Sequence, residues 1–166
     1  MPITVPELAT QCQQILNADQ GPVGRARVAD RLSELLADPA NVAALIPPQT
    51  GERDLLYQDP DLGFCIFAHQ YKGPKESQPH DHGPSWAIYA QASGETVMTD
   101  YEWATPDSEE APGKVRPSRT YILKPGDAHV YNEGDLHAPE RAGPTSLVRI
   151  EGLDMSKIKR RRYESI

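Results

Sequence analysis

Two histidines separated by one residue are the first candidates for chemistry in this sequence. His80 and His82 flank Asp81 in the segment QPHDHGPSW, residues 78–86. In an extended strand, residues two apart point to the same face, so both imidazoles can reach one metal ion while Asp81 points away. Neutral imidazoles suit Fe(II), Zn, Ni or Cu. The prolines and the glycine around the pair place it at a strand edge or at the mouth of a barrel.

A third metal ligand has to come from elsewhere, and residues 123–137 offer two candidates. His129 and His137 each follow a glycine by three residues. His137 comes directly after a tight turn and opens a strand, which favours it as the third ligand, and His129 is the alternative. The sequence therefore predicts a metal site formed by His80, His82 and His137.

The first third of the chain, residues 1–49, has the pattern of helices that pack on something larger. Thr4 and Glu7 form a capping-box pattern at the start of an apolar stripe with helical spacing. Gly21 and the proline after it predict the end of that helix. A second helix is predicted at residues 25–37, and a short helical turn follows it.

Residues 50–155 have the pattern of a β-barrel. Many short strands separated by glycine and proline turns indicate a sandwich or barrel rather than a parallel α/β sheet. The polar segment 104–118 is expected to be a long connector, and residues 156–166 form a basic C-terminal tail. With 166 residues, the whole chain fits one structural domain. The expected strands lie at residues 64–71, 86–92, 95–103, 120–123, 129–131, 136–139 and 146–151.

Composition excludes several classes of function. The chain has 24 acidic and 17 basic residues and a net charge of −7, which argues against a nucleic-acid partner. No apolar run approaches the roughly 20 residues of a membrane span, and the N-terminus lacks the basic and apolar regions of a signal peptide. The two cysteines, Cys12 and Cys65, make no disulfide framework. We therefore expect a cytoplasmic protein that acts at no membrane.

These motifs together resemble the cupin superfamily, and most closely its cysteine dioxygenase-like branch. The matching features are His80-x-His82, Gly94 after the first strand pair, and the Gly-x-x-His unit that ends at His137. The resemblance covers residues 53–152. It implies an all-β core folded as a double-stranded β-helix (jelly-roll) barrel, preceded by a helical segment. It also implies Fe(II) as the metal held by the three histidines, with Zn or Ni as possible occupants.

Several positions depart from the family pattern. Ordinary cupins carry a glutamate shortly after the second histidine, where this chain has Ser85, Trp86 and Ala87. The resemblance therefore implies three histidines without a carboxylate, as in thiol dioxygenases. Mammalian cysteine dioxygenases have a cysteine at the position of Ala87, so this chain can form no Cys–Tyr crosslink through that position.

The residues that would grip cysteine as a substrate are also altered. The family's Ser-x-His-x-Tyr triad would fall on residues 146–150, where Ser146 is kept but Val148 and Ile150 replace the other two members. The arginine that binds the substrate carboxylate in that family would fall one residue from Arg53. Both changes argue against cysteine itself as the substrate.

Strand position suggests which residues line a substrate pocket. The candidates are Arg53, Tyr71, Trp86, Tyr89 and Arg149. A charge such as that of Arg149 on a barrel strand needs a partner, which a carboxylate-bearing substrate or Glu151 could supply.

The leading functional hypothesis is a mononuclear non-haem Fe(II) dioxygenase. It would oxygenate a small bidentate anion of the thiol or enolate type, so its partners would be that small molecule and O2. The alternatives are a non-catalytic metal-binding cupin and a Zn-dependent hydrolytic or hydrating enzyme, since three histidines and a water also make a catalytic zinc site. Cupin barrels often pair through edge strands, so a homodimer is possible.

Overall fold

The computed structural model describes residues 1–166, except for the side chain of Lys157. The chain begins with helices α1 (Val5–Ala18), α2 (Pro22–Leu36) and α3 (Pro39–Leu45). The strands are β1 (Asp54–Gln58), β2 (Cys65–Tyr71), β3 (Lys75–Glu76), β4 (Ala87–Ser93), β5 (Thr96–Thr105), β6 (Gly113–Leu123), β7 (Ala128–Tyr131), β8 (Leu136–Arg141), β9 (Thr145–Glu151) and β10 (Tyr163–Ser165). A short 3-10 helix, η1 (Met155–Lys157), precedes the last strand.

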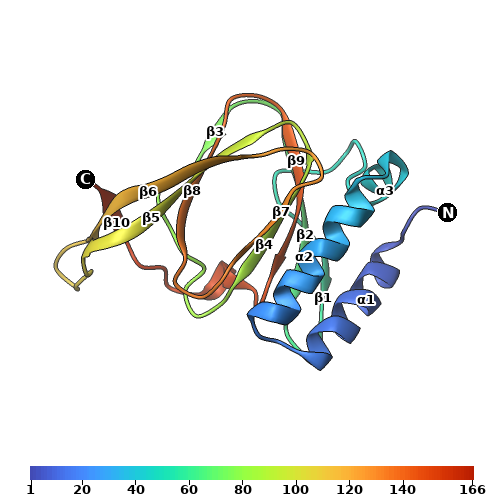
Figure 1. Cartoon of the computed structure of the whole chain (residues 1–166), viewed down its shortest axis with the longest axis horizontal. Coiled ribbons are helices and arrows are strands. Elements are labelled where there is room, and N and C mark those ends of the chain that lie inside the picture. Colours follow the sequence, from blue (N-terminus) through green and yellow to red (C-terminus); the bar gives the residue numbers. More distant parts are fainter.

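The strands form two facing sheets with the connectivity of a jelly roll (Figure 1). The first sheet has the order β1-β2-β9-β4-β7, and the second has the order β10-β6-β5-β8-β3. Strands β2 to β9 alone give the two four-stranded orders that two interlocked Greek keys produce. β1 and β10 extend one edge of each sheet. The strand order confirms the predicted all-β double-stranded β-helix with an N-terminal helical segment.

The helices cover one face of the first sheet. The predicted capping box is present, because the Glu7 N–H donates to the Thr4 hydroxyl and the Thr4 N–H donates to the Glu7 carboxylate. α2 packs on β4 and β7, and α1 lies against α2 and β1 (Figure 1). No described helix has the length and apolar character that a membrane crossing requires.

The strands at the centre of the first sheet have two chemically different faces. Ile66, Ile88 and Ile150 belong to the hydrophobic core beneath the helices. Because side chains alternate along a strand, the residues between these positions point towards the second sheet. That inner face carries polar groups such as Tyr89 and Arg149, one each on β4 and β9. The interior of the barrel is thus much more polar than the layer under the helices.

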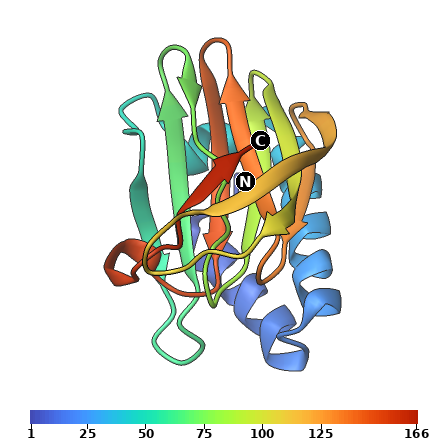
Figure 2. The same cartoon turned by 90° about the vertical axis from the view of Figure 1, so that its left-hand side faces the viewer.

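The structure differs from the expected elements in four places. β6 begins at Gly113, inside the segment expected to be a connector, and pairs with β5 in a long hairpin. Neither β1 nor the two-residue strand β3 was among the expected strands. Residues 163–165, assigned by the sequence to the basic tail, form β10 and pair in parallel with β6 at the edge of the second sheet (Figure 2).

Candidate metal centre

Three histidines from two segments converge inside the barrel. His80 and His82 precede β4, and His137 lies near the start of β8. One ring nitrogen from each lies within 4.8 Å of the other two, and this group contains no carboxylate. The backbone N–H of His80 donates a hydrogen bond of 2.9 Å to the carbonyl of His137, and the N–H of His137 donates one of 2.9 Å to the carbonyl of His80. This pair of hydrogen bonds holds the loop against β8. The structure therefore brings together the three residues predicted as ligands.

Hydrogen bonds to the backbone set the orientation of two of the imidazoles. The Nδ1 of His80 lies 2.8 Å from the carbonyl oxygen of Gln78, and the Nδ1 of His137 lies 2.9 Å from that of Asp135. A carbonyl can only accept, so Nδ1 carries the proton in both rings. The lone pair is then on Nε2, the atom that can bind a metal. A hydrogen bond from the far nitrogen is the usual support for a ligating histidine.

The spacing and charge of the histidines fit a metal ion. The Nε2 atoms of His82 and His137 lie 3.3 Å apart. Two nitrogen ligands that are each about 2.1 Å from one ion lie about 3.0 to 3.4 Å from each other. Burial lowers the pKa of His80 to about 4, and burial lowers the pKa of His82 and His137 well below the ordinary value. All three rings are therefore neutral and able to ligate near pH 7.

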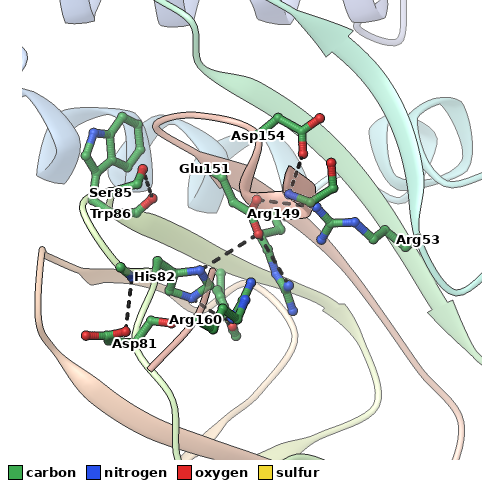
Figure 3. Close-up of polar contacts among 12 residues, drawn as sticks. Arg53, Asp81, His82, Ser85, Trp86, Arg149, Glu151, Asp154 and Arg160 are labelled. Atoms are coloured by element: carbon green, nitrogen blue, oxygen red, sulfur yellow. Dashed lines mark hydrogen bonds and ion pairs between the residues drawn. The ribbon is translucent and has the colours of Figure 1, made fainter. Parts of the chain in front are cut away.

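A buried carboxylate lies behind His82. The Nδ1 of His82 is 3.9 Å from Oε1 of Glu151, and neither atom has a hydrogen-bond partner among the described residues. Figure 3 shows His82 and Arg149 both turned towards Glu151. Oε1 of Glu151 lies 3.6 Å from Nη1 of Arg149, and Oε2 lies 3.4 Å from Nη2 of Arg53. The carboxylate of Glu151 thus joins the metal centre to two arginines. The sequence offered one sign of it, its position two residues after Arg149 on the same strand.

Tyr89 is the predicted pocket residue that lies closest to the three histidines. Its hydroxyl is 3.2 Å from Nε2 of His82 and 3.3 Å from Nε2 of His137. Burial raises the pKa of Tyr89, so the phenol keeps its proton. The guanidinium carbon of Arg149 lies 4.3 Å from the centre of the Tyr89 ring. Tyr89 and Arg149 are therefore both placed beside the metal centre.

The other predicted residues lie at different distances from the site. Arg53 is exposed and contacts the site only through Glu151. Tyr71 is inside the barrel, but its hydroxyl is near His69 rather than the three histidines. Trp86 is not brought to the site: its indole points away from His82 (Figure 3) and belongs to the core under the helices. The alternation of side chains explains this, because Trp86 shares a face with Ile88.

The alternative ligand His129 is outside the group of three. Its ring packs against Tyr131 and Tyr121, with ring centres 4.6 and 5.1 Å away. Val148 and Ile150, at the two replaced positions of the family's Ser-x-His-x-Tyr triad, both face the helices. The inward positions of β9 are instead those of Arg149 and Glu151.

The C-terminal segment holds the loop that carries two of the histidines. Asp81 points away from the metal centre, as expected for the residue between them, and its carboxylate accepts a hydrogen bond of 2.9 Å from the Tyr163 hydroxyl. Arg160 donates to the Asp81 carbonyl at 3.4 Å. Gly83 has a φ of 58°, and a side chain there would lie 2.9 Å from the Met155 methyl group. We call residues 158–165 the C-terminal strap.

Comparisons with known proteins give similarity in structure only. No protein-family model matches the sequence, and no curated protein matches it. The cupin domain of Schizosaccharomyces pombe Cnp3 is similar at 10% identity and a TM-score of 0.47, over 61% of this chain and 64% of that one. A cupin superfamily protein from Desulfitobacterium hafniense DCB-2 has 16% identity and a TM-score of 0.46, over 68% of this chain and 88% of its own. KdgF from Halomonas sp. has 16% identity and a TM-score of 0.45, over 60% and 74%. The strand order of the two sheets defines the fold of this chain.

Proposed function

We propose that this protein is a mononuclear non-haem Fe(II) dioxygenase that oxygenates a small bidentate anion of the thiol or enolate type. The observation that carries the proposal is the convergence of three neutral imidazoles without a carboxylate in the group. Such a ligand set adds no negative charge to the ion it holds. The metal centre would therefore favour a substrate that chelates as an anion and leaves room for O2.

His80, His82 and His137 would hold the metal. Fe(II), when bound, would supply the redox chemistry that the reaction of O2 requires. The protein's own groups would set orientation and protonation around it. The Tyr89 hydroxyl keeps a proton next to the Nε2 atoms of His82 and His137, where it can donate a hydrogen bond to a bound anion. Burial of the His82 and His137 rings limits the access of water on that side, and His80 is half-buried.

The proposal is tested by metal content and oxygen uptake together. Protein purified without added metal is expected to hold about one iron ion per chain, and His80→Ala is expected to lose it. His129→Ala is the matched control and should keep the iron, because His129 lies outside the group of three. The iron form is then screened for oxygen consumption with a panel of thiols and diketones. Failure of every member of the panel, with iron bound, would contradict the dioxygenase proposal.

A non-catalytic metal-binding protein is the second candidate. The observation that favours it is that Val148 and Ile150, at two positions of the family's outer triad, lie in the hydrophobic core. Ligand binding that is unchanged after metal removal would support this candidate. A zinc enzyme would instead hold Zn as purified and keep its activity without O2.

A further inference from the structure

Buried polar atoms without a partner gather inside the barrel. The six described residues that carry them lie on the inner face of β2, β8 and β9 or in the loop before β4: His69, His82, Arg141, Thr145, Arg149 and Glu151. His82 and Glu151 face each other at the metal centre. Arg149 lies beside them, 3.6 Å from Glu151, and the other three residues lie elsewhere on the inner strands. Buried polar groups are normally hydrogen-bonded, so such a cluster needs an explanation.

Arg141 is the most exceptional of these residues. Arg141 is the last residue of β8 and is only 2% exposed to solvent. No carboxylate among the described residues forms an ion pair with it. The guanidinium packs over the ring of Tyr71, with 4.6 Å between its carbon and the ring centre. Its Nε and Nη2 atoms are both buried and without a hydrogen-bond partner. A guanidinium remains charged in proteins, and an isolated buried charge is strongly unfavourable.

The two free nitrogen atoms of Arg141 form one edge of the guanidinium group. That edge carries two parallel N–H bonds, which match the two oxygens of a carboxylate. Arg149 adds a second positive charge from the facing sheet, and its Nε is also buried without a partner. Among the described residues, Glu151 is the only carboxylate that contacts Arg149 or Arg53, and none contacts Arg141. The described interior therefore holds more positive than negative charge, because the carboxylate of Glu151 stands against two arginines, Arg141 and Arg149.

We propose that Arg141, supported by Arg149, binds an anionic group of the substrate, a carboxylate or a group of similar shape. This rests on the proposed function, because the other end of the same substrate would meet the metal. Arg141 is four residues beyond His137 on β8, so about 13 Å separates their Cα atoms. The substrate class is thus a small organic acid with a chelating group at one end and an anionic group at the other.

The test uses metal-free protein, so that its outcome is independent of the metal. The probes are malonate, succinate and glutarate, titrated in a calorimeter, with uncharged succinamide as the comparison. We expect at least one dicarboxylate to bind, and Arg141→Met to weaken it by about tenfold or more. Arg119→Met is the matched control, because Arg119 is exposed and pairs with Asp100 on the second sheet. Arg119→Met should bind as the unaltered protein does.

Two results would overturn the proposal: no dicarboxylate binds, or Arg141→Met binds as tightly as the unaltered protein. Thermal unfolding of Arg141→Met is measured alongside. Loss of an unpaired buried charge should leave the unfolding temperature equal or higher, whereas a purely structural role predicts a fall. If that variant does not fold, Arg141→Lys replaces it, since lysine keeps the charge but lacks the two-bond edge and should also bind more weakly. Absence of iron or of oxygen uptake would contradict the proposed function while leaving the dicarboxylate result intact.

Discussion

At the scale of single residues, Glu151 is where the metal centre meets the charged interior. Its side chain is fully buried, and His82, Arg149 and Arg53 approach it within 3.9 Å. A carboxylate in this position can fix the proton of His82 on Nδ1 once the two groups close to hydrogen-bond distance. It also offsets part of the charge of the arginines.

Glu151→Gln is therefore expected to weaken both the fold and the metal site. Removal of one partner from a buried ion pair costs about 3 kcal/mol of unfolding free energy, and loss of such outer support lowers metal affinity by about tenfold or more. Urea unfolding and metal titration measure the two effects. Glu34→Gln is the control, because Glu34 pairs with Arg31 on the exposed surface of α2. Equal losses in both variants would contradict this role for Glu151.

At the scale of elements, the C-terminal strap and the histidine loop depend on each other. β10 pairs with β6, and Tyr163 at its start donates to the carboxylate of Asp81, between two of the metal-binding candidates. The far end of the chain therefore restricts the loop on which the metal centre depends. The basic composition of residues 156–166 did not predict the contact between Tyr163 and Asp81.

Tyr163→Phe should loosen the loop without removing any ligand. The lost hydrogen bond is worth about 1 kcal/mol, so we expect a weaker metal affinity by about fivefold with the same number of ions bound. Metal titration followed by a coloured chelator measures the affinity. Tyr101→Phe serves as the control, since its hydroxyl makes no hydrogen bond among the described residues. An unchanged affinity in Tyr163→Phe would show that the strap does not restrain the loop.

The sequence predicted most of the strands and the three converging histidines. It could do so because the signals are local: two histidines two residues apart, apolar runs, and turns at glycine and proline. The jelly-roll connectivity came from a family resemblance rather than from the pattern. β3 and β10 are too short to carry a pattern, and β1 has no buried residue to mark it. In β6, only Gly113 and Val115 are buried near the start, and residues 116–120 are exposed on a hairpin, where no buried face imposes alternation.

The remaining site residues depend on which face of a strand they occupy. Trp86 was predicted in the pocket, but sheet pairing turns it towards the helices. Glu151 and Arg141 both end strands, and only the pairing of those strands shows that they point inward. The sequence alone cannot fix that pairing, because a shift of one residue exchanges the two faces.

At the scale of the whole molecule, the buried histidines predict sensitivity to acid. Burial lowers the pKa of His80 to about 4 and that of His69 to about 2. A histidine in the unfolded chain titrates near pH 6.5. Below that pH the unfolded chain therefore binds more protons than the folded chain, in which the pKa values of these histidines are lower. The unfolding free energy of the metal-free protein should therefore fall from about pH 6.5 downwards, by about 1.4 kcal/mol per pH unit for each such histidine.

Urea unfolding at several pH values between 7 and 5 measures this slope. His69→Asn should remove the contribution of one histidine to this slope, because asparagine does not titrate. Its side-chain amide can replace the hydrogen bond that Nδ1 of His69 donates to the Glu52 carbonyl. Above pH 6.5 the histidines should add no pH dependence. A stability that is flat from pH 6.5 to 5 would contradict the prediction.

The two faces of the first sheet also bear on how new activities could arise in this barrel. Inward positions such as those of His69 and Tyr71 on β2 can change without disturbing the layer under the helices, because the strand keeps its apolar side for that layer. A mutant library restricted to alternate positions would vary the chemistry of the lumen while the scaffold stays constant. Adaptation to another small molecule would then need few substitutions, each separate from those that keep the chain folded.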